Sequence, residues 1–271
     1  MFRWIATASI VLACVCNPVA AQDKPAVSQC LAVANALPRA TFVSLRTAAA
    51  EKSQVTITYA GHSTYVIETP RNVTVATDFS GHYTAGKSPD VVTMNRAHSS
   101  HYTLSPDPRI PHVLRGWDDS DGPARHALSV GDIFIRNVPT DIRGYRSGSD
   151  SGMQKDGNSI FIFEVAGLCI GHLGHLHHAL DESHYAAIGR LDIVMVPIDG
   201  SMTLSLDGMS EITRRLRSSI VLPMHRFATP LSDFMARMNG QFEMDIRAER
   251  SFTVSLDTLP KKPTIVILDG V

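Results

Sequence analysis

Histidines are the residues of this chain best suited to chemistry, and four of the twelve fall within residues 171–178. The preceding segment, residues 159–170, is apolar and rich in β-branched and aromatic side chains, which predicts a buried strand. The histidine run then occupies the loop that leaves this strand. Neutral imidazole is the commonest protein ligand for zinc-like metals, so the run indicates a metal site. A solvated polar loop is the competing interpretation.

Three other places put a histidine just beyond a predicted strand. His62 follows Gly61, His98 and His101 lie in one short segment, and His225 closes the segment 219–225. Zinc sites draw their ligands from several loops in this way. Any one of these histidines alone would more often be a core or capping residue. Their shared position at strand ends favours a common centre.

The elements expected to position these loops are short. Apolar runs and alternating patterns predict strands at residues 55–59, 65–68, 73–77, 91–94, 112–114, 133–138, 159–170, 191–197, 219–223 and 264–268. Helical spacing predicts helices at residues 181–190, 207–218 and 230–238. The strands form a meander first and then alternate with helices. Residues 103–128 are expected to be rich in loops, and residues 143–158 to form a long surface loop of the kind that covers sites.

The composition is that of an ordinary globular protein. The chain has 271 residues, of which 44% are hydrophobic and 19% charged, with a formal net charge of −1. This is enough for one large domain or two small ones. The charge balance supplies no basic field for nucleic acid, so no nucleic-acid partner is expected. The sequence does not indicate an oligomeric state.

The N-terminus has the pattern of an export signal. Arg3 precedes an apolar stretch, residues 5–15, and Val19 and Ala21 are small residues at the positions that a signal peptidase reads. We expect residues 1–21 to be a signal peptide, residues 22–54 a linker with a short helix near 28–37, and residues 55–271 one domain. Two alternatives are a membrane anchor, for which the apolar stretch is short, and lipidation at Cys14.

The cysteines give little information about the fold. Cys14 and Cys16 leave with the predicted signal, and only Cys30 and Cys169 remain. Two cysteines so far apart do not indicate a disulfide framework, and Cys169 is expected to be an inert thiol in a buried strand. An export signal on a chain without stapling cysteines favours a bacterial periplasm.

The order of the motifs resembles the metallo-β-lactamase superfamily, in the branch of metal-dependent hydrolases that includes the ascorbate-phosphate lactonase-like proteins. The matching stretches between residues 55 and 227 are Gly61-His62-Ser63, Val75 to Asp78-Phe79, Val91 to Thr93, Cys169 to His175, Asp192 to Pro197 and Val221 to His225. The resemblance implies an α/β fold: an αβ/βα four-layer sandwich of two mixed β-sheets flanked by helices.

The chain departs from the family's pattern of metal ligands. Arg96 stands where the H-x-H-x-D-H motif has its first histidine, and Ser100 stands where it has its aspartate. The next ligand histidine would fall near Thr140, and His175 replaces the bridging aspartate. The resemblance then implies a mononuclear site that favours zinc. Its expected ligands are His98, His101, His175 and His225.

The resemblance also suggests roles for the neighbouring side chains. His62 or His172 is expected to act as a base or oxyanion donor, Asp78 to orient an imidazole, and Arg96 to hold an anionic group. Asp199 either approaches the site or is a turn residue. The expected function is hydrolysis of a small, anionic ester, lactone or phosphodiester. A degenerate site serving as a periplasmic binding module is the main alternative, and a metal or small-molecule binder without catalysis is another.

Overall fold

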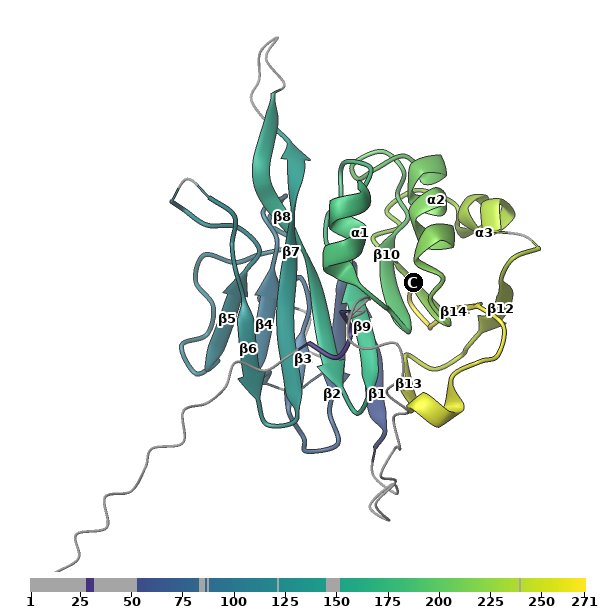
Figure 1. The fold of residues 1–271 in the computed structure, drawn as a ribbon, viewed down its shortest axis with the longest axis horizontal. Coiled ribbons are helices and arrows are strands. Elements are labelled where there is room, and N and C mark those ends of the chain that lie inside the picture. Colours follow the sequence, from purple (N-terminus) through teal and green to yellow (C-terminus); the bar gives the residue numbers. More distant parts are fainter. Residues whose placement is uncertain are drawn as a thin grey trace, which may run out of the picture.

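The computed structural model describes residues 28–31, 53–82, 86, 88–120, 122–144, 152–238 and 240–271. Two β-sheets form the body of the molecule (Figure 1). The six-stranded sheet has the order β13-β1-β2-β3-β4-β5. Its strands are β1 Val55–Gly61, β2 Thr64–Glu68, β3 Thr74–Ala76, β4 Val91–Met94, β5 His112–Arg115 and β13 Ser251–Val254.

The eight-stranded sheet has the order β12-β14-β11-β10-β9-β8-β7-β6. Its strands are β6 Ala127–Val130, β7 Ile133–Arg143, β8 Met153–Val165, β9 Leu168–His172, β10 Ile193–Pro197, β11 Ile220–Met224, β12 Glu243–Ile246 and β14 Thr264–Ile267. The pairs from β6 to β9 are antiparallel, and those from β9 through β10, β11 and β14 to β12 are parallel. In the six-stranded sheet, the pairs from β13 to β3 are antiparallel and those from β3 to β5 are parallel. Both sheets are therefore mixed, as expected.

The helices are α1 Glu182–Ile188, α2 Leu206–Leu216 and α3 Leu231–Met238, with a 3-10 turn at Leu256–Thr258. The three α-helices lie together beside β9, β10 and β14 (Figure 1). Alternate residues of β8 face opposite ways: Phe161 and Phe163 join the core between the sheets, while Ile160 and Ile162 join the core under the helices. Two mixed sheets with flanking helices confirm the expected architecture. On the outer face of the six-stranded sheet, loop residues such as Ile110 and Trp117 complete a third, smaller core.

Two loop and strand predictions were wrong. Residues 143–158 were expected to be a loop, but β7 runs to Arg143 and β8 begins at Met153, with Arg143 paired to Met153. The side chains at this end of the two strands are mostly polar, so no hydrophobic pattern indicates that their backbones pair. Residues 159–170 are not one strand, because Ala166 and Gly167 adopt positive φ and fold the segment into the β8–β9 hairpin.

The prediction for the cysteines was also wrong. Cys30 and Cys169 form a disulfide across 139 residues of sequence, so Cys169 is not a free thiol. Residues 28–31 form bends rather than the start of a helix, and the rest of the expected helix lies outside the described residues, as does the predicted signal peptide. Because the two cysteines are so far apart in the sequence, their spacing does not indicate that they pair.

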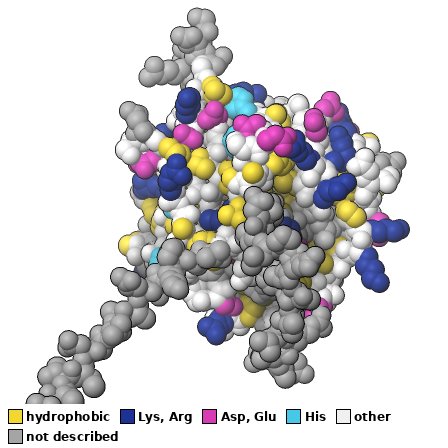
Figure 2. All heavy atoms as spheres, viewed as in Figure 1, with side chains coloured by type: hydrophobic (Ala, Val, Ile, Leu, Met, Phe, Trp, Pro, Cys, Tyr) yellow, Lys and Arg dark blue, Asp and Glu magenta, His cyan; other side chains and the backbone are white. Residues whose placement is uncertain are grey.

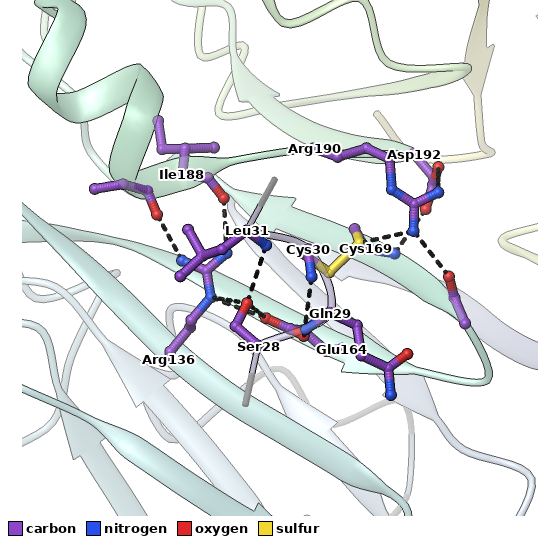
Figure 3. Close-up of a disulfide and its surroundings, with 12 residues drawn as sticks. Ser28, Gln29, Cys30, Leu31, Arg136, Glu164, Cys169, Ile188, Arg190 and Asp192 are labelled. Carbon is purple, nitrogen blue, oxygen red and sulfur yellow. Dashed lines mark hydrogen bonds and ion pairs between the residues drawn. A yellow bond between two sulfur atoms is a disulfide. The ribbon is translucent and has the colours of Figure 1, made fainter. Parts of the chain in front are cut away.

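Hydrogen bonds fasten the same short segment to the eight-stranded sheet (Figure 3). The backbone amides of Gln29 and Cys30 both donate to the carboxylate of Glu164 on β8, at 2.7 and 3.3 Å. Arg136 of β7 pairs with the same carboxylate at 2.9 Å and also donates to the Ile188 carbonyl at the end of α1. The buried carboxylate of Glu164 therefore accepts hydrogen bonds both from the amides of Gln29 and Cys30 and from Arg136.

The surface carries mixed charges. On the face shown in Figure 2, basic and acidic side chains are interspersed around apolar patches. None of the helices in the described residues is long and apolar enough to span a membrane.

Candidate metal centre

Five histidines from both sheets meet at one place. His62 lies in the turn between β1 and β2, His98 and His101 follow β4, His175 follows β9, and His225 follows β11. Neighbouring ring centroids lie 4.3 Å apart for His62 and His225, 4.5 Å for His98 and His101, and 4.7 Å for His101 and His175. The expected gathering of strand-end histidines is present in the structure.

Four of these rings form a group that could hold one ion. His62, His98, His101 and His225 each offer a ring nitrogen, and these four atoms lie within 4.8 Å of one another. Three of them are expected ligands, whereas His62 was expected to act as a base or donor. The ring of His175, the fourth expected ligand, stands almost perpendicular to those of His101 and His225, at 88° and 89°.

The backbone at this place is unusual. His62, Asp78 and His225 adopt positive φ values of 54°, 42° and 48°, a conformation that costs a residue with a Cβ on the order of 1–3 kcal/mol. The amide of His225 donates to the carbonyl of His62 at 2.8 Å, which ties the two sheets together here. Such strain persists only where the surrounding structure enforces it.

Gly174 sets the position of the His175 loop. Its φ is +62°, and a Cβ there would lie 2.4 Å from side-chain atoms of both Asn95 and Asn158. Asn158 accepts the His175 amide at 2.7 Å, and Asn95 donates to Asp78 at 2.7 Å. Only glycine therefore lets this loop approach the amide pair that holds it.

Carboxylates orient two of the imidazoles. Nδ1 of His101 lies 2.8 Å from Asp78, and Nδ1 of His225 lies 3.0 Å from Asp199. Nδ1 therefore carries the hydrogen in both rings, and Nε2 keeps its lone pair for a ligand. Nε2 of His101 is buried without a hydrogen-bond partner among the described residues. The prediction that Asp78 orients an imidazole is confirmed, and Asp199 does approach the site.

Ser100 serves the other two rings. Its hydroxyl lies 2.9 Å from Nε2 of His62 and 2.6 Å from Nδ1 of His98. A hydroxyl has one hydrogen and two lone pairs, so it can form a hydrogen bond with both rings at once. Nε2 of His98 lies 3.4 Å from Nε2 of His225. The serine at the motif's aspartate position thus supports the histidines instead of supplying a charge.

Burial favours the neutral form of four of these imidazoles, those of His62, His98, His101 and His175. Burial, reinforced by His225 and His98, lowers the pKa of His62 to about 4. Burial is also the main cause of the lowered pKa values of His98, His101 and His175. Neutral imidazole is the form that binds a metal, so the lowered pKa values of these four rings favour metal binding at neutral pH.

The two carboxylates respond differently to burial. Burial raises the pKa of Asp78. For Asp199, burial acts in the same direction, but hydrogen bonds from His225 and Thr203 outweigh it and lower the pKa. For Asp78, the neighbouring His172 and the hydrogen bond from Asn95 favour the charged form but do not outweigh burial, whereas for Asp199 the hydrogen bonds do.

These pKa values predict an acid-sensitive fold for the metal-free protein. The pKa of His62 and that of His177 are both about 4 in the folded chain, against an ordinary value of 6.5. Between pH 4 and pH 6.5 the unfolded chain binds more protons than the folded chain does. The free energy of unfolding should therefore be greatest above pH 6.5 and fall as the pH drops towards 4. Urea unfolding of chelator-treated protein from pH 7.5 to 4.5 measures this. An unchanged midpoint across that range would contradict it.

His172 and Arg96 occupy different surroundings from the group of four. His172 is buried, with Nε2 2.8 Å from the Ser63 carbonyl and Nδ1 accepting from the Gly174 amide at 3.1 Å. Both nitrogens thus bind backbone and hold the loop in place. Arg96 pairs with Asp119 at 2.9 Å and lies over Trp117, facing an adjacent cavity of about 440 Å³.

Sequence reasoning did not identify Ser100 or His177 as parts of the site. His177 binds His175 through Nε2 at 2.7 Å, and Ser100 bridges two histidines. Both residues were visible beside candidate ligands, but nothing in a sequence shows which neighbour supports which ring.

Comparison with known proteins fixes the family. The family model for the beta-lactamase superfamily domain matches residues 56–225. The chain belongs to this superfamily. A Pyrococcus furiosus protein named as a metal-dependent hydrolase is 25% identical over 191 residues, covering 63% of this chain and 84% of its own length. A Methanosarcina barkeri protein with the same description is 24% identical over 190 residues, covering 63% of this chain and 83% of its own.

Solved structures of the superfamily share the fold. A Thermotoga maritima protein, described as a candidate Zn-dependent hydrolase, superposes with a TM-score of 0.55 at 23% identity, covering 79% of this chain and 98% of its own. The Bacillus subtilis metallo-beta-lactamase fold protein YhfI gives a TM-score of 0.51 at 9% identity, covering 80% and 97%. Together with its relatives, this chain is a hydrolase of the metallo-β-lactamase superfamily.

Proposed function

We propose that this superfamily member is a zinc-dependent hydrolase that holds one ion per chain and cleaves a small, anionic ester, lactone or phosphodiester. The observation that carries the proposal is the group of four histidine nitrogens within 4.8 Å. Nitrogen donors of this kind suit zinc better than magnesium or calcium, which prefer oxygen. His98, His101 and His225 would hold the ion, with His62 as a further ligand.

The chemistry follows from the donor set. A zinc ion held by neutral imidazoles would supply a coordinated water with a pKa lowered to about 7 and would polarise a carbonyl or phosphoryl oxygen. Asp78 and Asp199 hold the hydrogens of His101 and His225 on Nδ1, so Nε2 of both rings would be available to an ion. His62 and His98, both partly exposed, form the open side through which a substrate would enter.

A single ion is favoured by charge. Within the described residues, the group of possible ligands contains no carboxylate, and the nearest ones, Asp78 and Asp199, are engaged by imidazoles. Nothing in the group would offset a second dication, and no side chain would bridge two ions as a carboxylate can.

The proposal of an anionic group on the substrate rests on Arg96. The cavity beside the loop that carries His98 is lined by Arg96 and Lys155 and also by Asp118, Asp119 and Asp156, so its charge as a whole does not select an anion. The Arg96 guanidinium is 38% exposed, and a planar guanidinium suits the oxygens of a carboxylate or phosphate. This is the basis for proposing an anionic group on the substrate.

A periplasmic location is the remaining part of the proposal. The disulfide between Cys30 and Cys169 is typical of proteins that fold in an oxidising compartment. It agrees with the export signal expected at residues 1–21.

The test uses mature protein made without a histidine tag. After dialysis, emission spectrometry should find one zinc per chain, and the protein should hydrolyse at least one of three probes: p-nitrophenyl acetate, bis(p-nitrophenyl) phosphate and a γ-lactone. A chelator should remove the activity and zinc restore it. Zinc without turnover would favour the binding-module alternative, and neither zinc nor turnover would refute the proposal.

A further inference from the structure

A chain of hydrogen bonds runs from the backbone into the histidine centre. The amide of Arg143 donates to Nδ1 of His177 at 2.7 Å, and Nε2 of His177 lies 2.7 Å from Nδ1 of His175. His175 is fully buried. Its second nitrogen, Nε2, is buried without a hydrogen-bond partner among the described residues.

The direction of this chain is fixed at its backbone end. A backbone amide only donates, so Nδ1 of His177 must accept. A neutral imidazole has one hydrogen, which in His177 is therefore on Nε2 and is donated to Nδ1 of His175. Because that nitrogen accepts, the hydrogen of His175 is on Nε2. The reverse direction would set two N–H groups against each other at 2.7 Å, between Arg143 and His177.

His175 therefore differs from its neighbours. The partners of Nδ1 in His101 and His225 are carboxylates, which accept, so Nε2 is a lone pair in both rings. In His175 the partner donates, so Nε2 is an N–H. The ring centroid of His175 lies 4.7 Å from that of His101 and 4.8 Å from that of His225. One centre thus combines lone pairs with a buried donor.

We infer that His175 is a hydrogen-bond donor to an anionic oxygen bound in the centre, and not a ligand of the metal. This rests on the proposed function, and it departs from the role expected for residue 175 from the family pattern. An N–H cannot coordinate a cation through the same nitrogen. A buried donor without a partner is costly, and an incoming anionic oxygen satisfies it. The substrate's oxygen therefore gains a hydrogen bond from a group that is already oriented.

The first experiment measures the hydrogen positions in metal-free protein. NMR spectra of protein labelled with ¹⁵N-histidine distinguish protonated from unprotonated ring nitrogens, and spectra of His175→Gln and His101→Gln assign the two rings. We expect the hydrogen on Nε2 in His175 and on Nδ1 in His101. A hydrogen on Nδ1 of His175 would overturn the inference. This readout needs no metal.

The second experiment separates metal binding from anion binding, with inorganic phosphate as the probe. His175→Phe keeps a ring but removes the donor, so zinc content should stay at one per chain while the dissociation constant for phosphate rises about tenfold or more. His175→Gln, whose amide can donate, should recover part of that loss. His101→Phe should lose zinc.

The two experiments distinguish the possible failures. Loss of zinc in both His175→Phe and His175→Gln would make His175 a ligand and overturn the inference. Zinc retained with unchanged phosphate affinity would also overturn it. Wild-type protein that binds no zinc would refute the proposed function, and the NMR spectrum would then confirm or overturn the position of the hydrogen by itself.

Discussion

Replacing His101 with glutamine is expected to abolish tight zinc binding and, with it, hydrolysis. His101 is fully buried, its Nδ1 is held by Asp78, and its Nε2 has no other partner in the described structure. Loss of a ligand should weaken zinc binding by more than the roughly 10–100-fold that follows loss of a residue that only orients a ligand. Competition against a chromophoric chelator measures the affinity.

The design separates a lost ligand from a damaged fold. The glutamine amide can still donate to Asp78, so the buried carboxylate is not left unpaired. His178→Gln is the matched control: it removes a histidine of the neighbouring loop that does not belong to the group of four. We expect the control to keep its zinc. A His101→Gln protein with wild-type affinity for zinc would remove His101 from the site.

Removing the disulfide should have the largest effect on stability. Cys30→Ser opens a link across 139 residues, and closing a loop of that size constrains the unfolded chain by about 3–5 kcal/mol. The free energy of unfolding, from guanidinium titration without reductant, should fall by that amount. Dithiothreitol should lower wild-type stability similarly and leave Cys30→Ser unchanged.

A double variant provides the internal check. Cys30→Ser and Cys169→Ser break the same bond, so the double variant should be about as stable as either single one. Additive losses would mean that each cysteine stabilises the fold by its own packing. Equal stability of Cys30→Ser and wild type would show that the link contributes nothing.

Much of the fold follows from local patterns because buried strands have a strong hydrophobic signature. The expected strand at residues 91–94 coincides with β4, and that at 191–197 contains β10. Strand β12 gave no such signal because it is largely exposed, and the alternating pattern of β13 extends over only four residues. Their pairing depends on neighbours that are distant in sequence.

The site was predictable to the level of positions, but not of roles. His98, His101 and His225 could be located because each follows a strand that the sequence predicts. What each ring does depends on its partner: Asp78 favours a lone pair on Nε2 of His101, whereas His177 favours a hydrogen on Nε2 of His175. Such partners meet only through the tertiary structure, and the pairing of Cys30 with Cys169 depends on it too.

The left-handed backbone at His62, Asp78 and His225 lowers the stability of the fold at the residues that build the centre. Glycine adopts that conformation without penalty, so a glycine at any of the three positions would relieve strain. It would also remove a side chain on which the centre depends. Selection for thermal stability alone would therefore favour substitutions at these three positions, with loss of the site. Stabilising substitutions that keep activity should be sought at positions remote from it.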